Sequence, residues 1–151
     1  MNSSSDKLKH KRISLEDAVP VIEQVLRSGG EFDLITAGNS MYPTLRHRRD
    51  GVSLVLPGRP VVGDILLCRR DDGSFVLHRL VFKLGGKYYI KGDNQQKSET
   101  VRYDQIIAKA SAILRNGTRI DRHSKEYYKR LVKVKIRQFL RKTDFDLFHE
   151  K

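Results

Sequence analysis

The chain has few of the residues that cross-link a fold or carry it across a membrane. It has 151 residues with one cysteine, Cys68, and no tryptophan. A single cysteine excludes an intramolecular disulfide and is typical of a reducing compartment. No run of 18 apolar residues occurs, and the first ten residues lack an apolar core, so neither a membrane span nor a signal peptide is predicted. We therefore expect a cytoplasmic protein.

Acidic residues are also scarce. The chain has 18 Asp and Glu against 30 Lys and Arg, a formal net charge of +12. Nine of the basic residues lie in the segment 122–142, where Glu126 is the sole acid, so this segment carries +8. Such an excess predicts an anionic partner or surface, and it belongs mainly to the C-terminal part of the chain.

Two segments have the apolar spacing of amphipathic helices. The first is 14–28, with Ser14 as N-cap, Gly29-Gly30 as the stop and Pro20 as a residue that could shorten or kink its start. The second is 125–141, a basic segment with interleaved apolar residues. Its apolar positions are Tyr127, Tyr128, Leu131, Val134 and Phe139.

The middle of the chain predicts a mostly antiparallel β-domain. Short β-branched and aromatic runs are separated by turn residues, among them Gly85-Gly86 and Asn116-Gly117. The predicted strands are 32–36, 52–56, 64–69, 75–83, 87–91 and 105–114. We divide the chain into a disordered leader (1–13), one domain that includes the first helix (14–121) and a basic helical tail (122–151).

Four short motifs follow one another in this β-domain. They are Gly38-Asn39-Ser40-Met41-Tyr42-Pro43, Gly63-Asp64-Ile65-Leu66, Phe75-Val76-Leu77-His78-Arg79-Leu80 and Lys91-Gly92-Asp93-Asn94. Their order and strand context resemble the S24/S26 serine peptidase superfamily, which contains the type I signal peptidases and the LexA-type repressors. The resemblance covers about 32–114. It implies a mainly β, signal-peptidase/LexA-like fold and a serine endopeptidase that needs no cofactor and no metal.

Ser40 is the predicted nucleophile. A serine hydroxyl is a poor nucleophile at neutral pH, so it needs a base within hydrogen-bond reach and backbone donors aimed at the developing oxyanion. Gly38 allows chain and substrate to approach closely, and Pro43 stiffens the chain after the serine. We assign Gly38, Asn39 and Met41 to substrate binding.

His78 is the predicted base. In LexA-type and bacterial signal peptidases a lysine precedes the arginine of this strand motif, whereas His78 precedes Arg79 here. This resembles the Ser/His signal peptidases of the endoplasmic reticulum and archaea. An unperturbed histidine, with a pKa of roughly 6.5, is mostly neutral near pH 7 and can take a proton. The resemblance assigns Asp93 as the acid that orients the base, with Glu99 and Asp104 as alternatives.

Each of these residues also has a structural interpretation. Ser40 could be a turn serine, His78 a buried core histidine, and Asp93 a turn residue of the Gly-Asp-Asn sequence. Cys68 is interpreted as a small apolar residue rather than a nucleophile. His47 has no motif around it.

The chain departs from the superfamily pattern near the nucleophile. Gly38 stands where signal peptidases commonly have a serine, so the oxyanion should rest on backbone N–H groups, including that of Ser40. The loop 43–50 is one residue longer than usual and lacks its glycine. Only 39 residues precede Ser40, which disfavours self-cleavage. We expect cleavage in trans of a peptide or protein bound as an added β-strand, for example in leader-peptide processing.

A non-catalytic module is the competing interpretation. The fold could bind peptides without cleaving them, with the basic tail binding an anionic membrane surface or, less readily, nucleic acid. The tail would then bring a cytoplasmic protein peripherally to a membrane. The cheapest discriminator is the relation of Ser40 to His78: side chains within hydrogen-bond reach at a cleft favour the enzyme, and side chains on opposite sides of the sheet exclude it.

Overall fold

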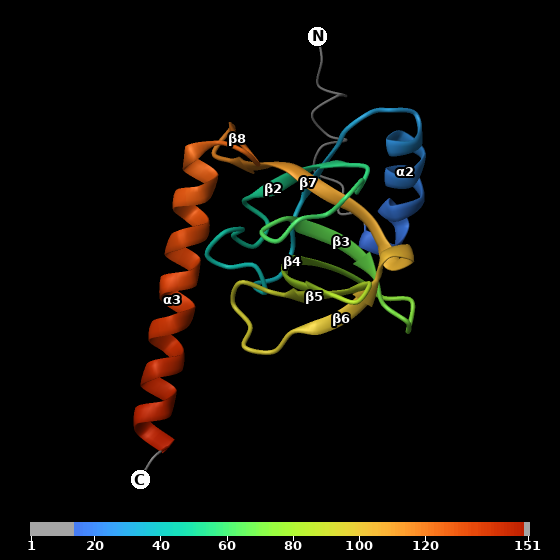
Figure 1. Ribbon diagram of the computed structural model, residues 1–151. Coiled ribbons are helices and arrows are strands. Elements are labelled where there is room, and N and C mark those ends of the chain that lie inside the picture. The colour runs from blue at the N-terminus through green and yellow to red at the C-terminus, as the bar shows by residue number, and fades with distance from the viewer. Residues whose placement is uncertain (1–13, 150–151) are drawn as a thin grey trace.

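The computed structural model describes residues 14–149, and the side chains up to residue 142. A short helix, α2 (Leu15–Arg27), precedes the strands, and a long one, α3 (Lys125–His149), follows them (Figure 1). The predicted leader 1–13 lies outside the described residues. Between the helices are β1 (Phe32–Ile35), β2 (Gly51–Val55), β3 (Ile65–Arg69), β4 (Phe75–Leu84), β5 (Lys87–Lys91), β6 (Glu99–Arg102), the 3₁₀ turn η1 (Tyr103–Gln105), β7 (Ile106–Arg115) and β8 (Thr118–Asp121).

The strands form one antiparallel sheet in the order β1-β2-β7-β3-β4-β5-β6, and β8 pairs with β7. The register shifts at Ser53/Leu54, at Leu67/Cys68 and between Leu80 and Phe82. Such irregularities increase local twist and bend the strands, and the sheet curls accordingly. The predicted mainly β, antiparallel architecture with a helix at either end is confirmed.

The curled sheet has two apolar clusters, one on each side of β3. Ile65 and Leu67 point into the larger cluster, and Leu66 and Cys68 into the smaller one, as strand alternation requires. α2 covers the larger cluster with Ala18, Val19, Ile22 and Leu26. The Ser14 hydroxyl accepts the Asp17 N–H and caps α2 as predicted, and Pro20 is accommodated inside the helix.

Two strands were not predicted, and the second helix is longer than expected. β6 and β8 are four-residue strands with few apolar side chains, so their sequences carry little strand signal. α3 continues past the predicted end at residue 141 to His149.

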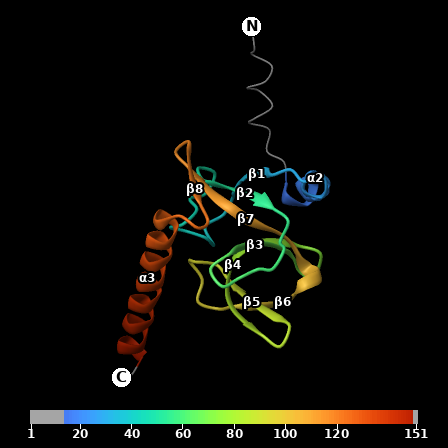
Figure 2. The same ribbon diagram turned by 45° about the horizontal axis from the view of Figure 1, so that its top comes forward.

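The first turns of α3 pack onto the β-domain. Tyr127 is buried, its hydroxyl donates to the Gly63 carbonyl (2.8 Å), and Arg79 donates to the same hydroxyl (3.0 Å). Arg122, just before α3, donates to the buried carboxylate of Asp64 (2.6 Å). Figures 1 and 2 show α3 beside the sheet, on the side opposite to α2. In the described part of the chain, neither helix combines the length and apolarity needed to cross a bilayer.

Candidate active site

Ser40 lies in a turn that follows β1 and is held from two sides. The Asn94 N–H donates to the Ser40 carbonyl (2.8 Å), and the Asn94 side-chain amide donates to the Asn39 carbonyl (3.1 Å). On the other side, the Gly38 N–H donates to His47 Nδ1 (2.6 Å). Gly38 has a φ of +91°, a left-handed conformation that a side chain would strain. The turn therefore presents Ser40 on an anchored backbone.

Gly92 allows the segment 92–94 to approach this turn. A Cβ at this position would stand 2.5 Å from the Ser40 carbonyl oxygen, a separation that real Cβ atoms do not show. Only glycine permits the contact without movement of either segment. The motif Lys91-Gly92-Asp93-Asn94 thus clamps the serine turn through Gly92 and Asn94.

Ser40 and His78 line the same cavity, which has a volume of about 360 Å³. Its walls are the end of β1 with the serine turn and the start of β4. No hydrogen bond joins the two side chains, and the hydroxyl and N–H of Ser40 make none to the described parts of the chain, whose side chains end at residue 142. Catalytic hydrogen bonds are often loose before substrate binds, so both groups are available to a ligand in the cavity.

His78 is buried on β4, with a carboxylate beside one ring nitrogen. Nδ1 is buried, makes no hydrogen bond to the described residues, and lies 3.4 Å from Glu99 Oε1. Arg70 donates twice to Glu99, with both distances 2.8 Å. These hydrogen bonds hold the pKa of Glu99 below its usual value, so Glu99 is a carboxylate beside the imidazole. Burial lowers the pKa of His78, against the opposing charge of Glu99, and keeps the ring neutral.

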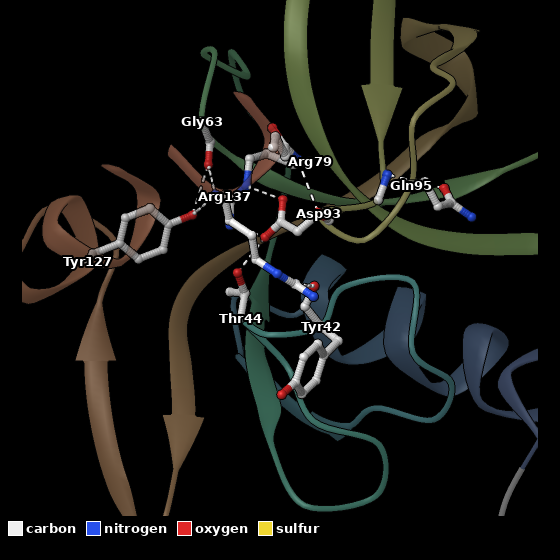
Figure 3. Close-up of polar contacts among 10 residues, drawn as sticks. Tyr42, Thr44, Gly63, Arg79, Asp93, Gln95, Tyr127 and Arg137 are labelled. Atoms are coloured by element: carbon white, nitrogen blue, oxygen red, sulfur yellow. Dashed lines mark hydrogen bonds and ion pairs between the residues drawn. The ribbon is translucent and has the colours of Figure 1, made fainter. Parts of the chain in front are cut away.

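Asp93, the acid assigned by the resemblance, is engaged elsewhere. Arg79 binds its two oxygens at 2.8 Å each, and the Thr44 hydroxyl donates to it as well (Figure 3). Burial disfavours the charge of Arg79, but its hydrogen bonds to the Asp93 carboxylate prevail and raise the pKa of Arg79. Asp104 is exposed and pairs with Arg102. Of the three carboxylates weighed from the sequence, Glu99 is therefore the one placed against His78.

The predicted substrate-binding residues have different positions. Gly38 and Met41 line the cavity, and Met41 is also buried in the larger apolar cluster. Asn39 is exposed and does not line the cavity; its carbonyl accepts the Tyr42 N–H (3.1 Å) and the Asn94 amide. Its contacts hold the shape of the turn.

Sequence reasoning missed three residues of the site. His47 anchors Gly38 from a loop without a motif, Arg70 holds Glu99, and Gln95 lines the cavity. No local pattern marks these residues, because each reaches the site only through the tertiary fold. Cys68 was interpreted as a small apolar residue; it is buried, and burial raises the pKa of its thiol to about 12.

A second hollow, of about 420 Å³, adjoins the first at Gln95, which lines both. It lies between the segment 91–96 and α3, and its lining includes three cationic side chains: Lys91, Arg141 and Lys142. No lysine lines the cavity that holds Ser40 and His78.

Among the side chains that the structure describes, residues 14–142, no group of three or more His, Cys, Asp and Glu is placed to hold a metal ion. In comparisons with known proteins, no protein-family model matches the chain, and no curated protein matches it.

Proposed function

We propose that the chain is a serine endopeptidase with a signal-peptidase/LexA-like fold, in which Ser40 is the nucleophile and His78 the base. The observation that carries the proposal is that both residues line one cavity while Glu99 flanks the buried nitrogen of His78. A nucleophile, a base and an acid behind the base are the parts that acyl transfer requires. The motif resemblance to the S24/S26 superfamily adds to this support.

In the proposed mechanism, Ser40 Oγ attacks the scissile carbonyl and gives its proton to His78 Nε2. In the catalytic step Nδ1–H of His78 would donate to Glu99 Oε1, now 3.4 Å away, and this hydrogen bond would fix the tautomer and stabilise the imidazolium. The Ser40 N–H, which has no partner among the described atoms, donates to the oxyanion. The imidazolium then protonates the leaving amine, and His78 activates a water that hydrolyses the acyl-enzyme and restores Ser40.

Other choices of base and nucleophile have less support. No lysine lines the cavity, and Lys83 donates to the Pro60 carbonyl (2.8 Å), so a Ser/Lys pair lacks its lysine. The thiol of Cys68, with a pKa of about 12, stays protonated at neutral pH and cannot act as a thiolate.

The proposed substrate is an extended segment of a peptide or protein, cleaved in trans. Among the described strands β1 pairs only with β2, so its other edge can accept an added strand. Residues 34–37, at the end of β1, line the cavity and would lead such a segment past Ser40. The cationic hollow beyond Gln95 favours a substrate with an acidic side chain, as in the processing of a precursor or leader peptide.

The proposal is tested by N-terminal profiling of peptides in cells that express the wild type, Ser40→Ala or the control Ser28→Ala. Ser28 is exposed at the end of α2 and away from the cavity. We expect a set of new N-termini with the wild type and the control that is lost with Ser40→Ala. Purified protein should show the same difference on the peptides identified. Identical N-termini in all three samples would overturn the proposal.

A further inference from the structure

α3 has an inner face that packs on the β-domain. Tyr127, Leu131 and Val134 are buried on this face. Further along it, Gln138 donates to the Asp93 carbonyl (3.1 Å) and Arg141 donates to the Asn94 side chain (2.9 Å). The inner face is therefore fully used within the molecule.

An apolar stripe lies on a different side of α3. Tyr128, Val132, Ile136 and Leu140 follow one another at intervals of four residues, and Phe139 lies beside them. In an α-helix this spacing places all of them on one side. These five side chains are 49 to 69 % exposed, so they form an apolar surface on the outside of the molecule. Of the five apolar positions named from the sequence, Tyr128 and Phe139 therefore belong to this exposed stripe, and the other three are buried.

The arginines and the lysines of α3 differ in whether they have partners within the protein. Its arginines contact the protein: Arg130 pairs with Glu126 (3.0 Å), Arg137 donates to the Tyr42 carbonyl (3.4 Å), and Arg141 reaches Asn94. Its lysines at 125, 129, 133 and 135 are exposed, and none has a hydrogen-bond or ion-pair partner in the described part of the chain. Lys142 lines the cationic hollow instead. The outer face of α3, defined as the apolar stripe with the other four lysines, thus combines apolar side chains with unpaired positive charge.

We propose that the outer face of α3 binds an anionic membrane surface. A helix that presents an apolar stripe bordered by lysines lies in the interface plane of a bilayer, with the stripe among the acyl chains and the ammonium groups at the anionic headgroups. Lysine suits this position because its long stem can follow the apolar surface while its charge stays in water. The inference is independent of the proposed function, since no residue of the outer face lines the cavity of Ser40 or the cationic hollow.

Other occupants fit the same face less well. Nucleic acid would pair with the lysines but leave the apolar stripe in water. A second copy of this chain would cover the stripe but set equal lysines against one another. An anionic bilayer satisfies both halves of the face, because it offers negative charge above an apolar interior.

The test is sedimentation of the full-length protein with vesicles of phosphatidylcholine, with and without phosphatidylserine. We expect binding to the phosphatidylserine vesicles that falls steeply as salt is raised from about 0.1 to about 1 M, because the Debye length shrinks from ~10 to ~3 Å. Replacement of Lys125, Lys129 and Lys133 by Gln should weaken binding roughly 100-fold. Deletion of α3 is unsuitable because Tyr127 is part of the core.

A second variant tests the apolar half of the face. Val132, Ile136 and Leu140 replaced together by Ser should also lose binding to the phosphatidylserine vesicles, and its melting temperature shows whether it folds. The matched controls are Phe82→Ser with Leu84→Ser, which are exposed on β4, and Lys87→Gln with Lys97→Gln, which are exposed outside α3. These should bind as the wild type does.

Three outcomes would overturn the proposal. Absence of binding to phosphatidylserine vesicles would do so directly. If the folded serine variant bound phosphatidylserine vesicles as well as the wild type, and the wild type also bound nucleic acid, the lysines would be assigned to nucleic acid. A dimer of the wild type in solution that the serine variant lacks, without vesicle binding, would assign the stripe to a second copy.

Discussion

Glu99 Oε1 lies 3.4 Å from His78 Nδ1, while Arg70 donates to both oxygens of Glu99. The three residues come from separate segments: Arg70 follows β3, His78 is within β4, and Glu99 begins β6. The fold thus places a carboxylate, itself held in position, behind a buried imidazole that lines the cavity of Ser40.

Glu99→Gln should lower kcat by about 10²- to 10⁴-fold, because the imidazole loses the charge that fixes its tautomer and stabilises its protonated form. Glu99 is partly exposed, so the melting temperature should change little. Steady-state kinetics on a cleaved peptide, with thermal unfolding of the same samples, make the measurement.

Asp93→Asn should mainly lower stability, whereas Glu99→Gln should mainly lower kcat. Removal of this charge leaves the guanidinium of Arg79 buried without its partner, which costs about 3–5 kcal/mol of the free energy of unfolding. Denaturant unfolding measures the loss. A stable but inactive Asp93→Asn protein, beside a fully active Glu99→Gln protein, would instead make Asp93 the catalytic acid.

The sequence predicted the regular parts of the fold, and its motifs pointed to the two residues of the proposed catalytic pair. Strands such as β5 are bounded by glycine turns and rich in aromatic and β-branched residues, so their limits follow from local chemistry. Ser40 and His78 were found because each stands in a motif. Both lie on the walls of one cavity, which no local pattern could show.

The carboxylate that lies beside His78 could not be chosen from the sequence. Glu99 faces His78 only because the β5–β6 hairpin folds back against β4, and that arrangement depends on the pairing of Ile90 with Glu99 and of Leu80 with Ile90. Asp93 stands in a motif, but its partner Arg79 is 14 residues away and becomes its neighbour only across the β4–β5 pairing. Asp93 stands in a motif but pairs with Arg79, whereas Glu99 stands in no motif but lies beside His78. Both contacts depend on the pairing of distant strands, which a local motif does not show.

The pH dependence of activity should reflect the burial of His78. Burial lowers its pKa, so the acid limb of the kcat/KM profile should fall below pH ~6.5, the value of an unperturbed histidine. Glu99→Gln removes the negative charge that opposes this shift and should move the limb lower still. Equal profiles for the wild type and Glu99→Gln would show that Glu99 does not act on His78.

The lowered pKa of His78 also makes the stability of the protein depend on pH. Because the unfolded chain protonates this histidine at about pH 6.5 and the folded chain only at a lower pH, stability should decrease as pH falls through that interval, by up to about 1.4 kcal/mol per pH unit. His78→Gln should lack this slope. Denaturant titrations of both proteins from pH 7 downward give the comparison.

Arg48 occupies a conformation that favours glycine. Its φ is +58°, its side chain is exposed, and it lies in the loop 43–50, where the superfamily pattern has a glycine that this chain lacks. Arg48→Gly should raise the free energy of unfolding by about 0.5–1 kcal/mol, since the relief of strain exceeds the added entropy of the unfolded chain. The neighbouring Arg49→Gly, without a positive φ to relieve, should lower it by about 0.5–1 kcal/mol. An equal loss in both variants would show that Arg48 carries no strain.

The cationic hollow should make the proposed peptidase prefer substrates with an acidic side chain. Lys91 lines this hollow with Arg141 and Lys142, and Gln95 connects it to the cavity of Ser40. A substrate carboxylate near Lys91 would gain roughly 1–2 kcal/mol at this partly exposed site, so Lys91→Glu should lower kcat/KM for an acidic peptide by about 10-fold or more.

The effect should appear in KM, because Lys91 would bind substrate and transition state alike. The isosteric peptide with Gln in place of Glu should show little change. The control Lys87→Glu alters the other end of β5, outside the hollow, and should leave both peptides unaffected. If Lys91→Glu lowered kcat equally for both peptides, Lys91 would not select acidic substrates. That result would favour Lys91 over His78 as the base.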